Sequence, residues 1–162
     1  MDIVRLGADD AARFMAMRRA GLEGDADSFR TSPTDDAQVP FAVWAERLAN
    51  EHVFAVCRDG QWLAIGGLAR ESRVKLDHKG LIWGMYAAPE ARGSGAADLL
   101  MEALIAAGEA MGLRQLQLTL MADNLRARRL YERHGFVVYA TEPASVRFGA
   151  SYADEALMWK LL

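Results

Sequence analysis

A short run of small residues in the middle of the chain has the composition of an anion-binding turn. It consists of Arg92, Gly93, Ser94, Gly95, Ala96 and Ala97. An apolar run over residues 81–88 precedes it and a helical pattern follows it, so a strand leads through this turn into a helix. Such a turn presents unpaired backbone N–H groups at the positive end of a helix dipole, where phosphate binds readily. Glycine lets the backbone approach a ligand closely, and Arg92 adds a forked cationic donor.

The spacing of this turn excludes three other glycine-rich loops. No lysine follows it, as the P-loop requires, and Asp98 stands at the third glycine position of a dinucleotide-binding loop. Arg92 stands where the nucleophile elbow G-x-S-x-G needs glycine. The turn does fit [QR]-x-x-G-x-[GA], through Arg92, Gly95 and Ala97. A tight turn that binds no ligand has the same pattern, so this motif alone does not establish a binding site.

A second motif, N-x-x-A-x-x-L-Y-x-x-x-G-F, begins about thirty residues after the turn. Its fixed positions are Asn124, Ala127, Leu130, Tyr131, Gly135 and Phe136. In this order, the two motifs resemble the GCN5-related N-acetyltransferase (GNAT) superfamily, and further positions look like those of its small bacterial members. The resemblance spans the chain and is strongest over residues 80–136. It implies acetyl-CoA as the co-substrate.

The resemblance assigns most contacts with acetyl-CoA to the backbone. The amides of residues 92–97 would hold the pyrophosphate, and main-chain groups of Met85 and Ala87 would pair with pantetheine like a neighbouring strand. One of these amides would polarise the acetyl carbonyl, as an oxyanion hole does. Asn124 would bond the pantetheine region, although capping its own helix explains this residue equally well. Arg126 would reach the 3′-phosphate, with Arg129 as a second candidate.

The same resemblance places the hydroxyl of Tyr131 near the CoA sulfur, where it would protonate the leaving thiolate. A core aromatic residue is the other interpretation of Tyr131. The acceptor must lose a proton, because an alkyl amine with a pKa of roughly 10 is almost entirely charged at pH 7. Glu71 and His78 are the candidate bases, and a water chain to solvent is an equal possibility. The three histidines show no metal-ligand spacing and there is one cysteine, so we expect no metal.

These assignments predict an enzyme that moves acetyl directly from acetyl-CoA to a primary amine of a small molecule or peptide. The alternative is a non-catalytic domain that binds acyl-CoA as a sensor or scaffold, which would not need the Tyr131 hydroxyl. We expect residues 20–40, 70–79 and 144–152 to form the acceptor cleft. Glu71 and Asp77 favour a cationic acceptor, whereas the basic residues of 70–79 would suit an acceptor carboxylate.

Composition limits the remaining possibilities. The 162 residues fit a single domain, 1–162, with 52% hydrophobic and 25% charged residues. The formal net charge of −3 gives no basis for general nucleic-acid binding. A lone Cys57, an acidic N-terminal segment and the lack of a long apolar run favour a reducing, cytoplasmic location without a membrane partner. The closing strands could pair between chains, so a homodimer is possible.

The elements that position these motifs follow from hydrophobic periodicity. Strand–helix–strand over residues 81–121 is a βαβ unit whose strands run parallel, and the flanking hairpins are antiparallel. This predicts a mixed α/β fold, with a twisted sheet of about seven strands and helices on both faces. The resemblance adds that the two parallel strands splay apart around the cofactor. Helices are expected at residues 8–20 (with Ala12, Met15 and Arg19 on one stripe), 41–50, 96–111 and 124–135, and strands at 2–6, 53–57, 62–68, 81–88, 116–120, 136–139 and 156–162.

Overall fold

The computed structural model describes all 162 residues and is built on one seven-stranded sheet. The strands are β1 (Asp2–Arg5), β2 (His52–Arg58), β3 (Gln61–Arg70), β4 (Lys79–Ala87), β5 (Gln115–Met121), β6 (Val137–Phe148) and β7 (Ser151–Leu161). The helices are α1 (Ala11–Gly24), α2 (Pro33–Ala37), α3 (Phe41–Asn50), α4 (Ala96–Ala110) and α5 (Leu125–Arg133), with short 3₁₀ turns η1 (Ala8–Asp10), η2 (Ala26–Ser28) and η3 (Pro89–Ala91). The sheet order is β1-β2-β3-β4-β5-β7-β6, and only β4 and β5 are parallel. This confirms the predicted mixed α/β fold.

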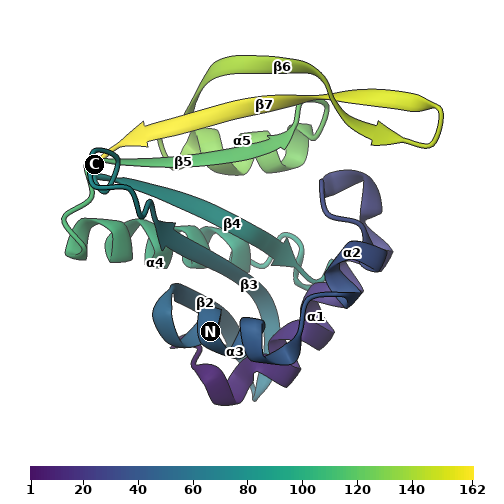
Figure 1. Cartoon of the computed structure of the whole chain (residues 1–162). Helices are drawn as coiled ribbons and strands as arrows, with labels where there is room; N and C mark the ends of the chain where they lie inside the picture. Colours follow the sequence, from purple (N-terminus) through teal and green to yellow (C-terminus); the bar gives the residue numbers. More distant parts are fainter.

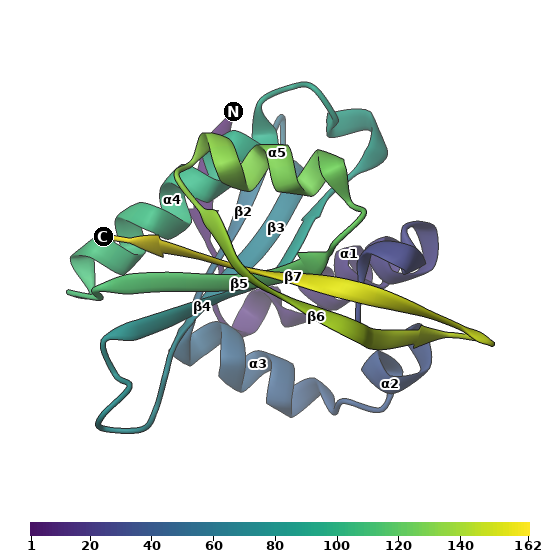
Figure 2. The ribbon, with the colours of Figure 1, turned by 90° about the horizontal axis from the view of Figure 1, so that it is seen from above.

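Helices cover both faces of the sheet, as predicted (Figures 1 and 2). α4 and α5 lie on one face, where 20 buried residues, among them Leu100 and Leu104, form the larger core. α1 and α3 lie on the opposite face, where Phe14 and Trp44 belong to a core of nine buried residues. Each face of the central strands is therefore held by its own apolar cluster.

The two parallel strands separate shortly after they pair. Their ladder covers three residue pairs, from Lys79–Gln115 to Leu81–Gln117. Further along β4, Gly84 has a φ of +63° and the register with β3 shifts between Ile65 and Gly67. Glycine adopts this left-handed conformation without steric cost, and the resulting bulge bends the strand. β4 and β5 diverge beyond this point (Figure 1), which confirms the expected splay.

The first helix differs from its prediction in length and rotation. It runs to Gly24, and it buries Phe14 and Leu22 while Ala12 and Arg19 of the predicted stripe are exposed. The aromatic side chain decides the rotation, because the Phe14 ring packs 5.4 Å from that of Trp44 and 6.0 Å from that of Trp83. The buried stripe therefore follows positions 14, 18 and 22, which places an arginine between two core residues.

The closing hairpin is much longer than predicted. Residues 144–152, expected to be a loop of the acceptor cleft, instead belong largely to β6 and β7 and to the turn at Gly149. The sequence pattern is interrupted because the β6–β7 register shifts between Glu142 and Val146, where Pro143 and Ala144 (φ +49°) stand. The hairpin continues beyond this irregularity and projects from the sheet (Figure 2).

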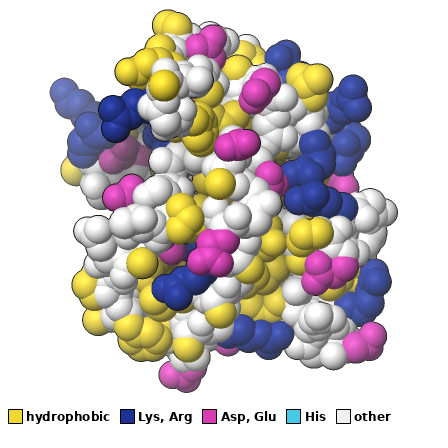
Figure 3. Space-filling view, turned by 90° about the vertical axis from the view of Figure 1, so that its right-hand side faces the viewer, with side chains coloured by type: hydrophobic (Ala, Val, Ile, Leu, Met, Phe, Trp, Pro, Cys, Tyr) yellow, Lys and Arg dark blue, Asp and Glu magenta, His cyan; other side chains and the backbone are white.

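The molecular surface at the end where β4 and β5 diverge is neither uniformly basic nor uniformly acidic. Basic and acidic side chains are interspersed there (Figure 3). No helix of the structure is both long and apolar enough to span a bilayer. No group of three or more His, Cys, Asp or Glu side chains is placed to hold a metal ion.

Candidate active site

A cavity of about 780 Å³ lies where β4 and β5 separate, and its lining reaches both faces of the sheet. Successive side chains of a strand point to opposite faces of the sheet, and this divides the cavity lining into two parts. Leu118 and Leu120 of β5 point into the core beneath α4, so Thr119 and Met121 point to the opposite face. We call the two parts the α4 half and the α1 half. The α4 half contains the turn over residues 92–97 and the start of α5.

The glycine turn has the backbone of an anion site. Gly93 and Gly95 have φ of +75° and +85°, and a Cβ added at either would meet no atom within 4 Å. Four cavity-lining residues have N–H groups without an acceptor in the protein: Gly93, Gly95 and Ala97 of the turn, and Asp98, which follows it in α4. The N–H group of Ser94 donates to the carbonyl of Ala91 and that of Ala96 to Oγ of Ser94, and neither Ser94 nor Ala96 lines the cavity. The free donors therefore belong to the residues that a ligand can reach.

Two arginines beside this turn share one carboxylate. Nη2 of Arg92 lies 3.4 Å and Nη2 of Arg126 lies 2.9 Å from Oδ2 of Asp25, which directly follows α1. Asp25 thus occupies the space between two cations that line the cavity. Arg129 and Arg133 also line the cavity, and Arg133 pairs with Asp98 at 2.8 Å.

The edge of β4 that faces the gap presents backbone groups to the cavity. Ala88 donates its N–H to Leu63 of β3, so by alternation the N–H groups of Ala87 and Met85 face away from β3, toward the gap. β5 does not pair with this part of β4, and both residues line the cavity. This open edge can pair with an extended ligand.

Asn124 fulfils its predicted capping role. Its Oδ1 accepts from the Ala127 N–H at 3.0 Å at the start of α5, and its Nδ2 donates to Oγ of Ser28 at 3.1 Å. The second bond ties α5 to the segment after α1. Both polar atoms of the side chain therefore have protein partners, and a ligand contact would compete with the bond to Ser28.

Tyr131 lies on the cavity wall with its ring in the larger core. The residue is 7% exposed, and its ring packs 6.2 Å from that of Phe136. The hydroxyl makes no hydrogen bond within the protein. Burial raises the pKa of Tyr131 to about 12, because the phenolate would lose its hydration. The side chain is thus a neutral donor that faces a ligand site.

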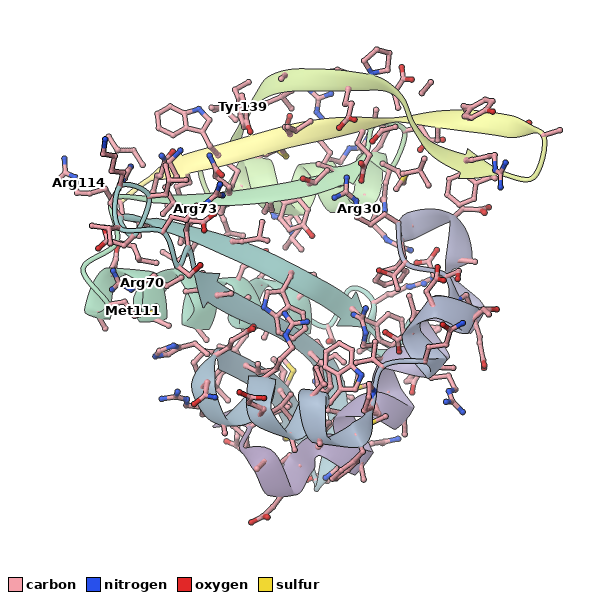
Figure 4. The ribbon with its side chains drawn as sticks, viewed as in Figure 1. Arg30, Arg70, Arg73, Met111, Arg114 and Tyr139 are labelled. Carbon is pink, nitrogen blue, oxygen red and sulfur yellow. The ribbon has the colours of Figure 1, made fainter.

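The structure does not bring Glu71 into the cavity. Its carboxylate bonds Arg73, with Oε2 lying 2.8 Å from Nη2, and this bond lowers the pKa of Glu71 to about 2. Arg70 and Arg73 lie at the end of the sheet opposite Arg30 (Figure 4), and no residue of 70–79 lines the cavity. His78 does not line the cavity either. Of the three segments expected to form the acceptor cleft, only residues 20–40 contribute to it, through side chains such as Phe29 and Arg30.

The α1 half contains Arg30, from the predicted segment 20–40, and three charged residues that sequence reasoning missed: Arg18, Arg47 and Glu155. Glu155 is 1% exposed and accepts hydrogen bonds from Arg30 and from the hydroxyl of Ser145. Arg18 gave no signal, because the stripe predicted for α1 (Ala12, Met15 and Arg19) left it outside the buried face. Glu155 gave no signal either, because it follows Asp154 in the same strand and the sequence does not show which of the two acids is buried.

Comparison with known proteins agrees with this geometry. A sequence model of the acetyltransferase (GNAT) family matches residues 19–136. The chain belongs to this family. No protein of curated function matches its sequence. A GNAT acetyltransferase from Streptococcus pneumoniae is 26% identical and superimposes with a TM-score of 0.85, covering 99% of this chain and 98% of its own.

Two further solved structures share the GNAT fold over the whole chain. A ribosomal-protein-alanine N-acetyltransferase from Brucella melitensis is 19% identical, with a TM-score of 0.85 and complete coverage of both chains. A putative acetyltransferase from Salmonella typhimurium, solved with its cofactor acetyl-CoA, is also 19% identical, with a TM-score of 0.85 and coverage of 100% and 94%. The protein is thus a GNAT acetyltransferase, an enzyme whose acetyl donor is acetyl-CoA.

Proposed function

We propose that this GNAT protein transfers acetyl from acetyl-CoA directly to a primary amine of a small molecule or peptide, without an acyl-enzyme. The observation that carries the proposal is the cavity that passes between β4 and β5. It joins free N–H donors and Tyr131 on one face of the sheet to a polar half on the other. A donor that enters from the α4 half and an acceptor that enters from the α1 half would meet at the bulge of β4.

The α4 half has the groups needed to hold CoA. The free N–H groups of Gly93, Gly95 and Ala97 would bind the pyrophosphate, with Arg92 beside them. Ser94 and Ala96 would shape the turn without touching the ligand. Arg126 would bind the 3′-phosphate once it leaves Asp25. These roles follow the chemistry of the donors, since phosphate oxygens accept from backbone amides and guanidinium groups alike.

The open edge of β4 would position the reacting atoms. Met85 and Ala87 would pair with pantetheine, and one of their N–H groups would bond the acetyl oxygen as it gains negative charge. Asn124 would keep the neighbouring start of α5 in place. Tyr131 would donate a hydrogen bond to the sulfur. The amine nitrogen forms a bond to the acetyl carbon, the carbon–sulfur bond breaks, and the thiolate leaves with this hydrogen bond and takes its proton from water.

The amine must also release a proton, and we propose that it passes to water. The acids that line the cavity are Asp25, Asp98 and Glu155, and each is bonded to an arginine. No histidine lines the cavity. A carboxylate held by an arginine is a poor base, because the cation favours its charged form. A solvent route also agrees with the position of Glu71 outside the cavity.

The decisive experiment changes the turn without changing the rest of the fold. Gly95→Asp places a carboxylate and a Cβ beside the free N–H groups, so calorimetric titration should show that CoA binding is lost. Gly112→Asp is the matched control, because Gly112 also has a positive φ (+70°), stands at the other end of α4 and meets no atom within 4 Å. Its backbone strain is similar, and CoA affinity should stay within about twofold of wild type.

A second measurement, thiol release from acetyl-CoA, distinguishes an acetyltransferase from a domain that only binds acyl-CoA. Thiol release with a panel of amines would show whether bound acetyl-CoA turns over. Binding without thiol release for any amine or peptide would leave the alternative, a domain that binds acyl-CoA as a sensor or scaffold. Unchanged CoA affinity in Gly95→Asp would remove the assigned cofactor site itself.

A further inference from the structure

Three arginines line the α1 half of the cavity, and their partners leave donors free. Arg18 pairs with Asp36 at 2.7 Å, Arg47 pairs with Glu51 at 2.9 Å, and Arg30 pairs with Glu155. Of the three carboxylates, only Glu155 lines the cavity. The wall that a ligand meets here is therefore rich in N–H donors and poor in free acceptors.

Arg18 is the most fixed of these cations. Its side chain is only 11% exposed and lines the cavity from the buried stripe of α1. Asp36, which is itself buried, accepts from Nε, and the two terminal nitrogens of Arg18 make no hydrogen bond within the protein. The guanidinium also lies over the ring of Trp44, with its carbon 4.9 Å from the centroid. The side chain is thus held in place while four of its five N–H donors stay unused.

The free end of Arg18 lies beside the bulge where the reaction is proposed to occur. A Cβ built on Gly84 would stand 3.3 Å from Nη1 of Arg18. Gly84 is the residue with positive φ in β4, directly before Met85. An acceptor amine near Met85 would therefore have this guanidinium as a close neighbour. A second cation so near would repel a purely cationic amine.

Arg47 supplies a second set of donors from α3. Its Nε and Nη2 bond the two carboxylate oxygens of Glu51, which leaves Nη1 free. The guanidinium carbon stacks 3.8 Å from the centroid of the Trp83 ring, and both residues line the cavity. Gly67 makes this position of Trp83 possible, because a Cβ there would lie 2.4 Å from the indole ring. Arg47 is therefore held against the same strand that carries the bulge.

We propose that Arg18 and Arg47 bind the carboxylate of the acceptor, which is a small amino acid acetylated on its amino group. This inference rests on the proposed function. Forked guanidinium donors match the two oxygens of a carboxylate, and a carboxylate close to the amine fits donors that lie close to the bulge. Phe29, Leu81, Trp83 and Tyr86 line the same half and favour an apolar side chain on that amino acid.

The test compares acceptors that differ only in the carboxylate. Apolar L-amino acids such as leucine would be assayed beside the amines that they give on decarboxylation, such as 3-methylbutylamine, with thiol release as the readout. Rates would be referred to the concentration of neutral amine, since the pKa values of the two amines differ. For at least one pair, kcat/KM should be about 10- to 100-fold higher for the amino acid, the range expected for hydrogen bonds to a charged group.

The variants remove the forked donors and keep the positive charge. Arg18→Lys still neutralises Asp36, and Arg47→Lys serves if Arg18→Lys does not fold, because Arg47 is more exposed (34%). Either change should lower kcat/KM for the amino acid about 10-fold or more, and change that for the decarboxylated amine less than about threefold. Arg19→Gln is the control, since Arg19 is the exposed neighbour on α1 and does not line the cavity.

The outcomes separate this inference from the proposed function. If the decarboxylated amines react as well as the amino acids, or if both lysine variants keep their kcat/KM for amino acids, the carboxylate subsite is overturned and acetyl transfer stands. If neither set releases thiol although acetyl-CoA binds, and a polyamine and a peptide also fail, the transfer itself is overturned and the subsite with it. Preference for the amino acid that is lost in the variants supports the subsite.

Discussion

At the scale of single residues, the raised pKa of Tyr131 sets what this side chain can do. An ordinary thiol has a pKa of roughly 8.5, well below the value of about 12 for Tyr131, so complete proton transfer to a free thiolate is uphill. We infer that the hydroxyl acts chiefly as a hydrogen-bond donor while charge builds on sulfur. Tyr131→Phe keeps the packing against Phe136 and removes this donor. Steady-state kinetics should show kcat lowered at least 10-fold, with little change in KM for acetyl-CoA.

The pH dependence distinguishes this role from titration of Tyr131. A raised pKa means that the neutral, donating form persists at every pH below about 12. The loss in Tyr131→Phe should therefore be a constant factor from about pH 6 to 10, without a new limb. A wild-type kcat in this variant would instead assign Tyr131 to the core alone.

Glu71 provides a second test at this scale. Its low pKa, caused first by the bond to Arg73, and its position outside the cavity argue against a role in deprotonation. Glu71→Gln should leave kcat/KM within about twofold and leave the acid-side limb of its pH profile unchanged. Loss of that limb in the variant would show that the 70–79 segment reaches the acceptor during turnover.

At the scale of elements, the segment after α1 lies against the side of the cavity that we propose for the CoA phosphates. Asp25 holds Arg92 and Arg126, and Ser28 holds Asn124, so this segment occupies the partners proposed for CoA. Asp25→Asn removes a carboxylate that would repel the phosphates and frees both arginines. Calorimetry should show CoA binding several-fold tighter, worth about 1 kcal/mol, with the gain reduced at high salt.

Asp27→Asn is the control for this prediction, because Asp27 is an exposed residue of η2 without a hydrogen bond or ion pair. It changes the net charge equally and should leave CoA affinity nearly constant. Weaker binding in Asp25→Asn would mean that the carboxylate positions the arginines for CoA and does not compete with it.

The elements that the sequence predicted well are those with a strong local signal. Alternating Leu116, Leu118 and Leu120 identified β5, and the positive φ of Gly112 (+70°) ends α4 as expected. The cap at Asn124 was equally clear. The rotation of α1 depended on distant aromatic contacts of Phe14, and the length of β6 depended on pairing across the irregularity at Pro143, so neither could be obtained from local periodicity.

In the candidate site too, residues with a local sequence signal were predicted and residues that meet only in the folded chain were not. The turn over residues 92–97 was singled out by the spacing of its glycines and Tyr131 by the family resemblance of its motif, and the structure places both on one cavity. The acceptor half was not found, because Arg18, Arg47 and Glu155 come from α1, α3 and β7 and meet only after the chain folds. Glu71 appeared close because it follows β3, but that end of the strand points away from the gap (Figure 4).

At the scale of the whole molecule, the splay divides the sheet into two parts with little direct pairing. Strands β1–β4 and β5–β7 share only the three residue pairs between β4 and β5. The cavity occupies the space where further pairs would be. A ligand that pairs with the free edge of β4 would supply contacts that the protein itself lacks, and would therefore stabilise the molecule as a whole.

Binding of acetyl-CoA should raise the unfolding temperature by an amount that follows from linkage. At a concentration of about 100 times Kd, the ligand adds about 2.7 kcal/mol to the free energy of unfolding. For a chain of this length each kcal/mol shifts Tm by about 2–4 °C, so the rise should be about 5–11 °C in a thermal melt. Gly112→Asp should show the same rise from its own lower Tm, and Gly95→Asp should show none.

Hydrogen exchange should slow in residues 82–87 of β4 and in β5, because both border the filled gap. A full rise in Tm without that local protection would place acetyl-CoA at a different site.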